Sequence, residues 1–135
     1  CKKARIINNC ILYYRQHGQS VMRKYSMWDR VEFTKILFSY NKEKVIEFNN
    51  KILMGKMYTY YFRVITNIFF EFINVVEKKE LLNLYKKALN EEIFKEIINH
   101  ASKQQLPVYK KIELYLFKVN AIKLLIFYYR IKSRV

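Results

Sequence analysis

The stretch from Met57 to Val76, MYTYYFRVITNIFFEFINVV, most constrains the fold, because it is almost entirely apolar over a length that could cross a bilayer. A polar stripe along one face of a lone membrane-spanning helix would be costly to expose to lipid. We therefore expect the central, mostly buried helix of a soluble helical bundle and favour it over a membrane span. The polar exceptions, spaced four, four, four and three residues apart as on one helix face, are Thr59, Arg63, Asn67, Glu71 and Asn74.

Two further helices are predicted before this stretch. Ser26 followed by Asp29 has the spacing of a capping box and predicts a helix start. We expect Asn41 to interrupt that helix. A second helix is expected from Lys42 to Met54, with Gly55 as its C-terminal stop.

The second half of the chain is also helical in its pattern. Residues 78–100 predict two amphipathic helices broken near Asn90, where this asparagine could cap the second one. ASKQQLP, residues 101–107, is typical of a loop, and Pro107 suits the first turn of a last helix from about Val108 to Lys132. The expected fold is mainly α, a bundle of about five or six helices.

The charge balance indicates an anionic partner. The chain has 26 Lys and Arg against 11 Asp and Glu, a net charge of +15, while 52% hydrophobic residues argue against disorder. Nucleic acid, an acidic membrane surface and a phosphate-bearing ligand all fit, and an AT-rich genome could explain part of the bias. The two cysteines lack metal-site spacing, so we expect a reducing compartment. The start at Cys1 without Met suggests a fragment.

Residues 11–20, ILYYRQHGQS, differ in chemistry from the rest of the chain. Arg15 could clamp a phosphate bidentately, His17 could donate to a phosphate or ligate a metal, and Ser20 could add a hydroxyl. Gly18 would let the backbone turn close to a ligand. The alternative is a surface turn in which His17 merely packs. The apolar run just before it, Cys10 to Tyr14, could be a short strand or a helical turn.

The run ILYYRQHGQSV resembles a segment near the end of the catalytic domain in family 2 glycosyltransferases, the GT-A fold enzymes of bacterial polysaccharide synthesis. The tail LPVYKKIELYLFKVNAIKLLIFYYRIKSRV is similar to their C-terminal helix. The resemblance implies that Arg15, His17 and Ser20 contact the diphosphate of a nucleotide-sugar donor, with His17 near a divalent metal, Mg²⁺ or Mn²⁺. Many members carry Asn where this chain has Gln19-Ser20, and a serine hydroxyl could make a similar hydrogen bond.

The resemblance also implies a division of the chain. Residues 1–25 would be the remnant, with a possible strand, of a GT-A α/β domain, and residues 26–135 a C-terminal helical accessory domain. The chain has no Asp-x-Asp motif, and Asp29, its only aspartate, is better explained as a helix-start residue. The glutamates are expected to be solvated partners of lysines on helix faces. The parent enzyme would transfer sugar from a nucleotide donor to a glycan or lipid-linked acceptor, and this part alone would be inactive.

The last predicted helix suggests a contact with an anionic membrane. It is apolar at nearly every angle, so it could pack in the bundle or lie in a membrane interface with its cations reaching head groups. We expect a cytoplasmic protein, peripheral at the inner face of the cell membrane. Rival readings are a nucleic-acid-binding domain, disfavoured because aromatics fall on predicted buried faces, and an interaction module that forms homo-oligomers through apolar faces. The expected anion contacts are Lys118, Lys123, Arg130, Lys132 and Arg134.

Overall fold

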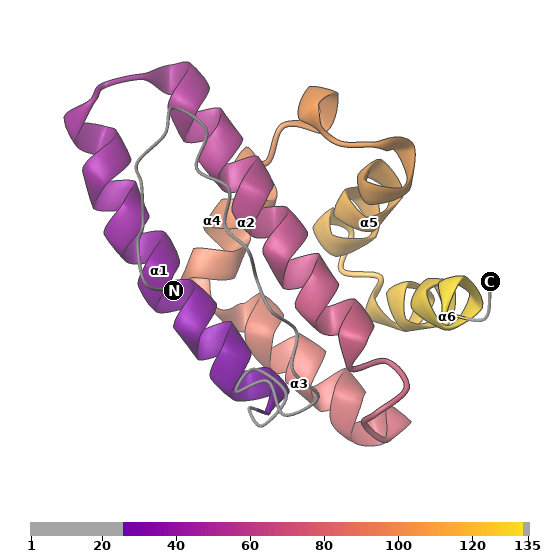
Figure 1. Cartoon of the computed structure of the whole chain (residues 1–135). Coiled ribbons are helices and arrows are strands. Elements are labelled where there is room, and N and C mark those ends of the chain that lie inside the picture. Colours follow the sequence, from indigo (N-terminus) through magenta and orange to yellow (C-terminus); the bar gives the residue numbers. More distant parts are fainter. Residues whose placement is uncertain (1–25, 134–135) are drawn as a thin grey trace, which may run out of the picture.

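The computed structural model describes residues 26–133, and these form six α-helices and one 3₁₀ turn (Figure 1). Within that range there is no strand. The predicted mainly α bundle is thus confirmed for the described residues, while the predicted GT-A remnant lies outside them. The elements are α1 (Met27–Glu47), α2 (Lys51–Glu71), α3 (Lys78–Asn90), α4 (Glu92–His100), η2 (Lys103–Gln105), α5 (Val108–Lys118) and α6 (Ile122–Lys132).

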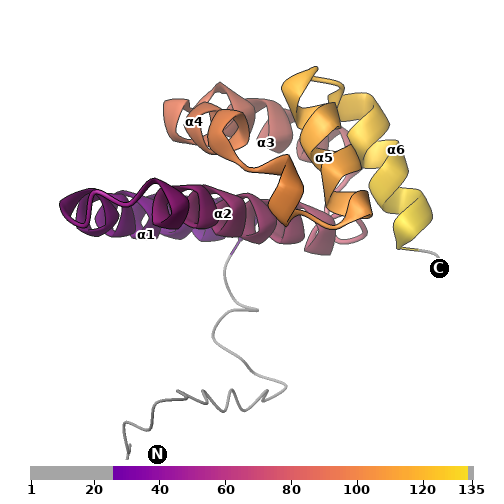
Figure 2. The same ribbon diagram turned by 90° about the horizontal axis from the view of Figure 1, so that it is seen from above.

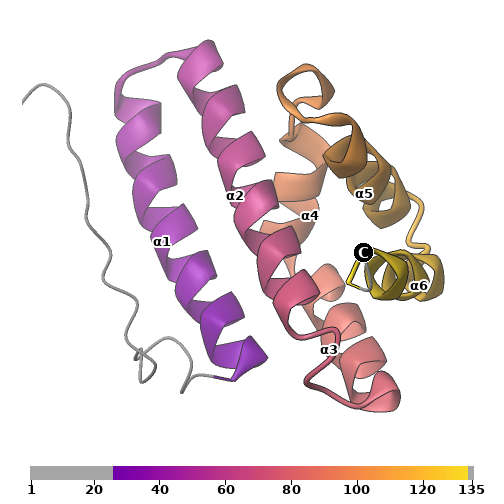
Figure 3. The same ribbon diagram turned by 45° about the vertical axis from the view of Figure 1, so that its right-hand side comes forward.

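The helices lie in two layers. The first is an antiparallel hairpin of α1 and α2, and the second, formed by α3 to α6, packs on one side of it (Figures 2 and 3). The core between the layers is aromatic, with the ring of Phe69 stacked on that of Tyr85 at 4.2 Å between centroids. The Tyr85 hydroxyl donates to the Phe69 carbonyl at 2.7 Å, so this buried polar group is satisfied. The largest fully buried side chains include Phe38, Phe62, Phe69, Tyr85, Phe94 and Tyr129.

The predicted capping box at the start of α1 is confirmed. The Asp29 amide donates to Ser26 Oγ at 3.1 Å, and the Ser26 amide donates to the Asp29 carboxylate at 3.0 Å. These bonds satisfy backbone donors that have no partner within the helix. Next to the cap, the Lys87 ammonium of α3 lies 3.7 Å from the ring centroid of Trp28, a cation–π contact that joins α3 to α1.

The predicted break at Asn41 and the predicted stop at Gly55 are both wrong. Asn41 stays helical, and its amide donates to the Tyr61 hydroxyl across the hairpin at 2.5 Å. Gly55 lies inside α2, where the Thr59 hydroxyl donates to its carbonyl at 2.8 Å. The turn instead falls at Asn49, whose φ of 45° is left-handed, and Asn50, whose side chain accepts from the first amides of α2.

The predicted single helix over residues 108–132 is also wrong, because the chain breaks at Asn120. This residue has a φ of 53°, and its amide donates to the Phe117 carbonyl at 3.1 Å. The Ala121 amide donates to the Leu116 carbonyl at 2.9 Å, which completes a Schellman motif at the end of α5. Two short helices therefore replace one long one. The predicted break near Asn90 is confirmed, but Glu91 occupies the N-cap position of α4.

The expected central helix is confirmed as α2, although it ends at Glu71 rather than near Val76. Its polar side chains do not stay on one face, because residues four apart drift by about 40° per step around a helix. Thr59 is buried and accepts from the Ser102 amide at 3.0 Å, whereas Arg63, Asn67 and Glu71 are exposed. The stripe therefore begins on the inner side of α2 and ends on the outer side.

Candidate functional site

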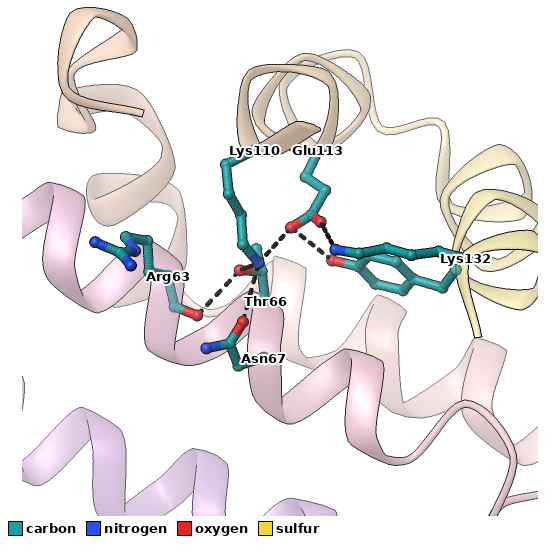
Figure 4. Close-up of polar contacts among 7 residues, drawn as sticks. Arg63, Thr66, Asn67, Lys110, Glu113 and Lys132 are labelled. Atoms are coloured by element: carbon teal, nitrogen blue, oxygen red, sulfur yellow. Dashed lines mark hydrogen bonds and ion pairs between the residues drawn. The ribbon is translucent and has the colours of Figure 1, made fainter. Parts of the chain in front are cut away.

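A buried ion pair on α5 forms the polar centre of the second layer (Figure 4). Lys110 and Glu113 lie about one helical turn apart, and their side chains are only 4% and 0% exposed. The Lys110 ammonium is 2.7 Å from the Glu113 carboxylate. A glutamate on this helix was expected to be solvated, and for Glu113 that expectation is wrong.

The rest of this network ties α5 to its neighbours. The Lys110 ammonium also donates to Thr66 Oγ1 at 2.5 Å and to Asn67 Oδ1 at 3.1 Å, both on α2. An ammonium has three N–H donors, and all three are used here. Glu113 additionally accepts from the Tyr129 hydroxyl at 3.3 Å and from the Lys132 ammonium at 3.2 Å, both on α6. The network therefore connects α5 to α2 and α6, and no N–H donor of Lys110 is left for a substrate. We call Lys110, Glu113 and their four partners the joint.

The protonation of the joint follows from its burial. Burial lowers the pKa of Lys110, and the bond to Glu113 opposes this shift. Burial raises the pKa of Tyr129 well above its ordinary value, and the negative charge of Glu113 adds to this effect. Tyr129 therefore remains a neutral hydroxyl that donates to the carboxylate at neutral pH.

Burial of Glu113 leaves α5 and α6 with only positive charge on their surface. Glu113 is the single acidic residue of these two helices. Lys118 and Lys123 are exposed, and Arg130 is partly exposed. Lys132 lies apart from them, because its ammonium pairs with Glu113 and also lies 4.4 Å from the ring centroid of Tyr109.

A cleft of about 740 Å³ lies where α3 and α4 meet α5 and α6, and we call it the basic cleft. Its apolar lining comes from core side chains such as Leu82, Leu89 and Ile98 and from the exposed Leu124. Among the described residues that line it, none carries a carboxylate. One of its lysines, Lys95, pairs with Glu92 outside the lining at 2.8 Å. The polar lining consists of Lys86, Lys95, Lys118, Lys123, Asn90, Asn99 and Asn120.

A second hollow continues the basic cleft toward the end of α6. It shares Lys123 and Leu82 with the cleft and adds Lys78 and Arg130. The exposed side of α6 beside it is apolar, since Leu124, Phe127 and Ile131 are 60%, 63% and 51% exposed. Their spacing of three and four residues places them in one stripe. Chemically, this surface combines cations, amides and apolar groups, as a binder of amphiphilic anions requires.

The predicted site residues are placed unevenly. Arg15, His17, Ser20 and Arg134 lie outside the described residues. Lys118 and Lys123 line the basic cleft together, and Arg130 lines the adjoining hollow. Lys132 belongs to the buried network instead. Their contact with an anionic surface stays a prediction.

The sequence reasoning did not find the part of the cleft that α3 and α4 supply. Lys86 and Lys95 lie on the exposed faces of these amphipathic helices, as solvated lysines usually do. Nothing in their spacing pairs them with Lys118 or Lys123. Only the packing of α3 and α4 beside α5 and α6 brings the four cations to one cleft.

Other classes of site find less support in the described part of the chain. No three His, Cys, Asp or Glu side chains between residues 26 and 133 are grouped as a metal ion would need. None of the helices there has the length and apolarity to traverse a membrane. Comparison with protein-family models, with curated proteins and with solved structures gives no match.

Proposed function

We propose that residues 26–135 are the C-terminal accessory domain of a nucleotide-sugar-dependent glycosyltransferase of bacterial cell-surface glycan synthesis, held by α5 and α6 against an anionic membrane. The enzyme class is supported by the resemblance of residues 11–21 and 106–135 to segments of family 2 glycosyltransferases. One observation carries the membrane role: all exposed charge on α5 and α6 is positive and lies beside exposed apolar side chains.

The size of these effects is sufficient for reversible binding. A cation near an anionic lipid surface contributes about 1 kcal/mol, and full burial of a Leu, Ile or Phe side chain contributes about 1.5–3 kcal/mol. Lys118, Lys123 and Arg130 supply the cations, and the stripe on α6 supplies the apolar part. Salt screens the first contribution and leaves the second. Partial insertion of α6 would therefore give weak, salt-sensitive attachment.

In this proposal, the two parts of the parent enzyme divide the work. Arg15, His17 and Ser20 would contact the donor diphosphate, a bound Mg²⁺ or Mn²⁺ would supply neutralisation of its charge, and a carboxylate base outside residues 1–135 would activate the acceptor. The helical domain keeps the enzyme at the inner face of the membrane. Lipid-linked acceptors are confined to that surface, so attachment raises their encounter rate with the donor site.

Vesicle sedimentation tests the membrane role. Vesicles of phosphatidylglycerol and phosphatidylcholine should bind the chain at low salt, and vesicles of phosphatidylcholine alone should not. The double variant Lys123→Glu/Arg130→Glu should lose about tenfold in affinity or more. Lys51→Glu/Lys56→Glu, the same charge change on exposed positions of α2, is the matched control. Equal losses in both variants, or tighter binding to a DNA duplex than to vesicles, would contradict a membrane contact through α6.

Turnover of nucleotide sugars tests the enzyme class separately. The chain joined to its natural upstream sequence should consume one member of a panel of UDP, GDP and dTDP sugars. Arg15→Ala and His17→Ala should each lower that turnover, because a donor-phosphate contact is lost. An upstream sequence without a strand-rich nucleotide-binding domain would overturn the enzyme class and leave the vesicle result unaffected.

A further inference from the structure

The basic cleft gathers positive charge without a matching negative charge. Each of the four helices around it contributes one exposed lysine to its lining. Among residues 26–133, only Lys95 of these four forms an ion pair, with Glu92. Like charges held close to one another repel, and this cost falls when an anion lies between them. The four residues are Lys86 of α3, Lys95 of α4, Lys118 of α5 and Lys123 of α6.

The start of α6 belongs to the lining of the same cleft. The N-cap residue Ala121 and the first three residues of the helix, Ile122, Lys123 and Leu124, all line it. The first amides of a helix have no partner within it, and Ala121 has no side chain that accepts from them. The helix dipole favours negative charge at this end, yet the first turn contains no acidic residue and one lysine. A helix start alone does not define a site, but here it requires the same kind of ligand as the lysines do, an anion.

Phosphate fits this set of donors. The side-chain amides of Asn90, Asn99 and Asn120 also line the cleft and can donate hydrogen bonds without adding charge. Phosphate oxygens accept from ammonium groups and from backbone amides alike. A phosphate monoester carries a charge of about −1.5 to −2 near pH 7, and a phosphodiester carries about −1. Because most of the cleft lysines have no carboxylate partner within residues 26–133, the monoester offsets more of their repulsion.

An apolar surface leads out of the basic cleft. Leu124 lines the cleft, and Phe127 lines the adjoining hollow of about 240 Å³. Both are more than half exposed, and Ile131 continues their stripe. From Leu124 to Ile131 the stripe runs about 10 Å, since each helical residue rises about 1.5 Å. Exposed apolar side chains next to a cationic cleft match a lipid with a phosphate head group better than a free phosphate ion.

We propose that the basic cleft binds the phosphate monoester head group of one membrane lipid, whose chain lies along Leu124 and Phe127. The lysine ammonium groups and the first amides of α6 surround the phosphate, and the exposed stripe of α6 covers part of the apolar chain. The inference rests on the membrane part of the proposed function, because it names the lipid class that α5 and α6 meet. It does not require the enzyme class.

Titration with a water-soluble lipid tests this site in the full chain. Dihexanoyl phosphatidic acid, kept below its critical micelle concentration, supplies a phosphate monoester with short apolar chains. In ¹H–¹⁵N NMR spectra we expect saturable shifts of the side-chain amides of Asn90, Asn99 and Asn120 and of the Lys123 backbone amide, which all line the cleft. The side-chain amide of Asn50, at the α1–α2 turn, is the internal reference and should not shift. Shifts that do not saturate, or that are as large at Asn50 as in the cleft, would overturn the site.

Three comparison ligands identify the group that is recognised. Inorganic phosphate has the charge without the chains, and dihexanoyl phosphatidylcholine has the chains without net charge. Each should bind at least about tenfold more weakly than dihexanoyl phosphatidic acid, because each lacks one of the two contributions. Dihexanoyl phosphatidylglycerol, a phosphodiester, should fall between them and the monoester. Equal affinity for inorganic phosphate would overturn a lipid as the ligand, equal affinity for phosphatidylcholine would overturn the role of the lysines, and equal affinity for phosphatidylglycerol would overturn the preference for a monoester.

A pair of variants assigns the binding to the cleft. Lys86→Gln/Lys118→Gln removes two exposed cations of the lining and should weaken binding of dihexanoyl phosphatidic acid at least about tenfold. Lys103→Gln/Lys111→Gln removes the same charge from exposed positions on η2 and α5 that do not line the cleft, and should stay within about twofold of the parent protein. Equal losses in the two variants would show an effect of net charge alone and would overturn the site.

Vesicle sedimentation gives an independent result. Sedimentation with phosphatidylglycerol vesicles, without saturable binding of dihexanoyl phosphatidic acid, would overturn the head-group site and leave the membrane role in place. Saturable binding in the cleft without sedimentation would overturn the membrane role and the membrane lipid as ligand, and would leave the cleft as a site for soluble phosphate monoesters.

Discussion

Two surfaces of the molecule expose large apolar side chains, but the charges around them differ in sign. One is a groove of about 780 Å³ on the α1–α2 hairpin, which we call the outer groove and which is lined by Phe33, Ile36 and Leu37 of α1 with Val64 and Ile68 of α2. The other is the surface of α5 and α6. Phe33 in the groove is 54% exposed and Phe127 on α6 is 63% exposed, so the exposure of these aromatics does not distinguish the two surfaces. Three carboxylates and one guanidinium line the first, whereas all the charged residues that line the hollow beside α6 are Lys or Arg. The net charge of +15 is thus unevenly distributed. The sign of the charged side chains around each apolar surface, rather than the exposure of its apolar side chains, decides which partner that surface fits.

The difference arises from where the carboxylates lie. The acidic residues of α1 remain on its surface. Asp29 and Glu32 line the groove, and Glu32 also pairs with Lys35 at 3.1 Å. The only carboxylate of α5 and α6, on Glu113, is fully buried as the counter-ion of Lys110. A single buried residue therefore keeps the second surface wholly basic.

Glu113→Gln should have the largest effect on stability, because it leaves the Lys110 ammonium buried without a counter-charge. We expect the free energy of unfolding to fall by about 3–5 kcal/mol. The variant Lys110→Met/Glu113→Leu removes both charges and should recover most of this loss. Urea denaturation followed by circular dichroism measures both. If the double variant were no more stable than the single one, the joint would act through packing and not through charge.

Phe38→Ala and Phe33→Ala compare the two sides of α1 directly. Phe38 is 1% exposed in the core and Phe33 is 54% exposed in the groove. We expect a loss of about 3–5 kcal/mol for the first and less than half of that for the second. The same urea experiment on the full chain gives both values. Similar losses would show that the groove side is as well covered as the core.

Ser26→Ala should cost about 1 kcal/mol, because it removes the side-chain acceptor of the capping box at the groove end of α1. Ser26→Thr keeps a hydroxyl that can accept from the Asp29 amide and donate to the Asp29 carboxylate, as Ser26 Oγ does at 2.7 Å, and should stay close to the parent protein. Thermal unfolding of the three proteins measures the order. Equal stability of Ser26→Ala and the parent protein would show that the capping box does not contribute.

Acid should weaken the contact between α4 and the α1–α2 hairpin, because Glu96 of α4 is bonded to Lys42 of α1 and Tyr58 of α2. Burial alone would raise the pKa of Glu96, but hydrogen bonds from Lys42 and Tyr58 outweigh burial, so the pKa lies below its ordinary value of 4.5. The stabilisation is complete above pH 4.5 and is lost as the pH falls through the lower, folded-state pKa. The pair is partly exposed, so the effect should stay below about 1 kcal/mol. Urea denaturation midpoints measured at several pH values should show this acid-induced loss of stability in the parent protein and a smaller loss in Glu96→Gln.

Local signals were predictable from the sequence where short-range bonds decide the structure. The cap of Ser26 and Asp29 needs only residues three apart, and it was found. The breaks at Asn49 and Asn120 depend on a left-handed backbone that asparagine tolerates. The Asn49-Asn50 pair was a usable signal for the first of them. Asn41 and Gly55 were expected to end helices, but both lie inside one. Packing of α1 against α2 keeps Asn41 helical through its bond to Tyr61, and Gly55 lies within α2.

The buried network was not predictable, because its pattern also occurs on the surface. Glu92 and Lys95 are three residues apart, as Lys110 and Glu113 are, yet Glu92 is 88% exposed and Glu113 is 0% exposed. What differs is the packing of α2 and α6 around α5. For the same reason, the outer groove was not foreseen: the pattern of α2 is apolar on several sides and does not show which side remains open.

The Lys87 contact with Trp28 also gives the protein an internal optical probe. Trp28 is the only tryptophan of the chain, so its emission comes from one place, the second residue of α1. A cation 3.7 Å from the ring centroid perturbs the indole, and separation of α3 from α1 would remove that perturbation. Emission at this one position can therefore report, without an added label, whether the two layers stay joined near the start of α1.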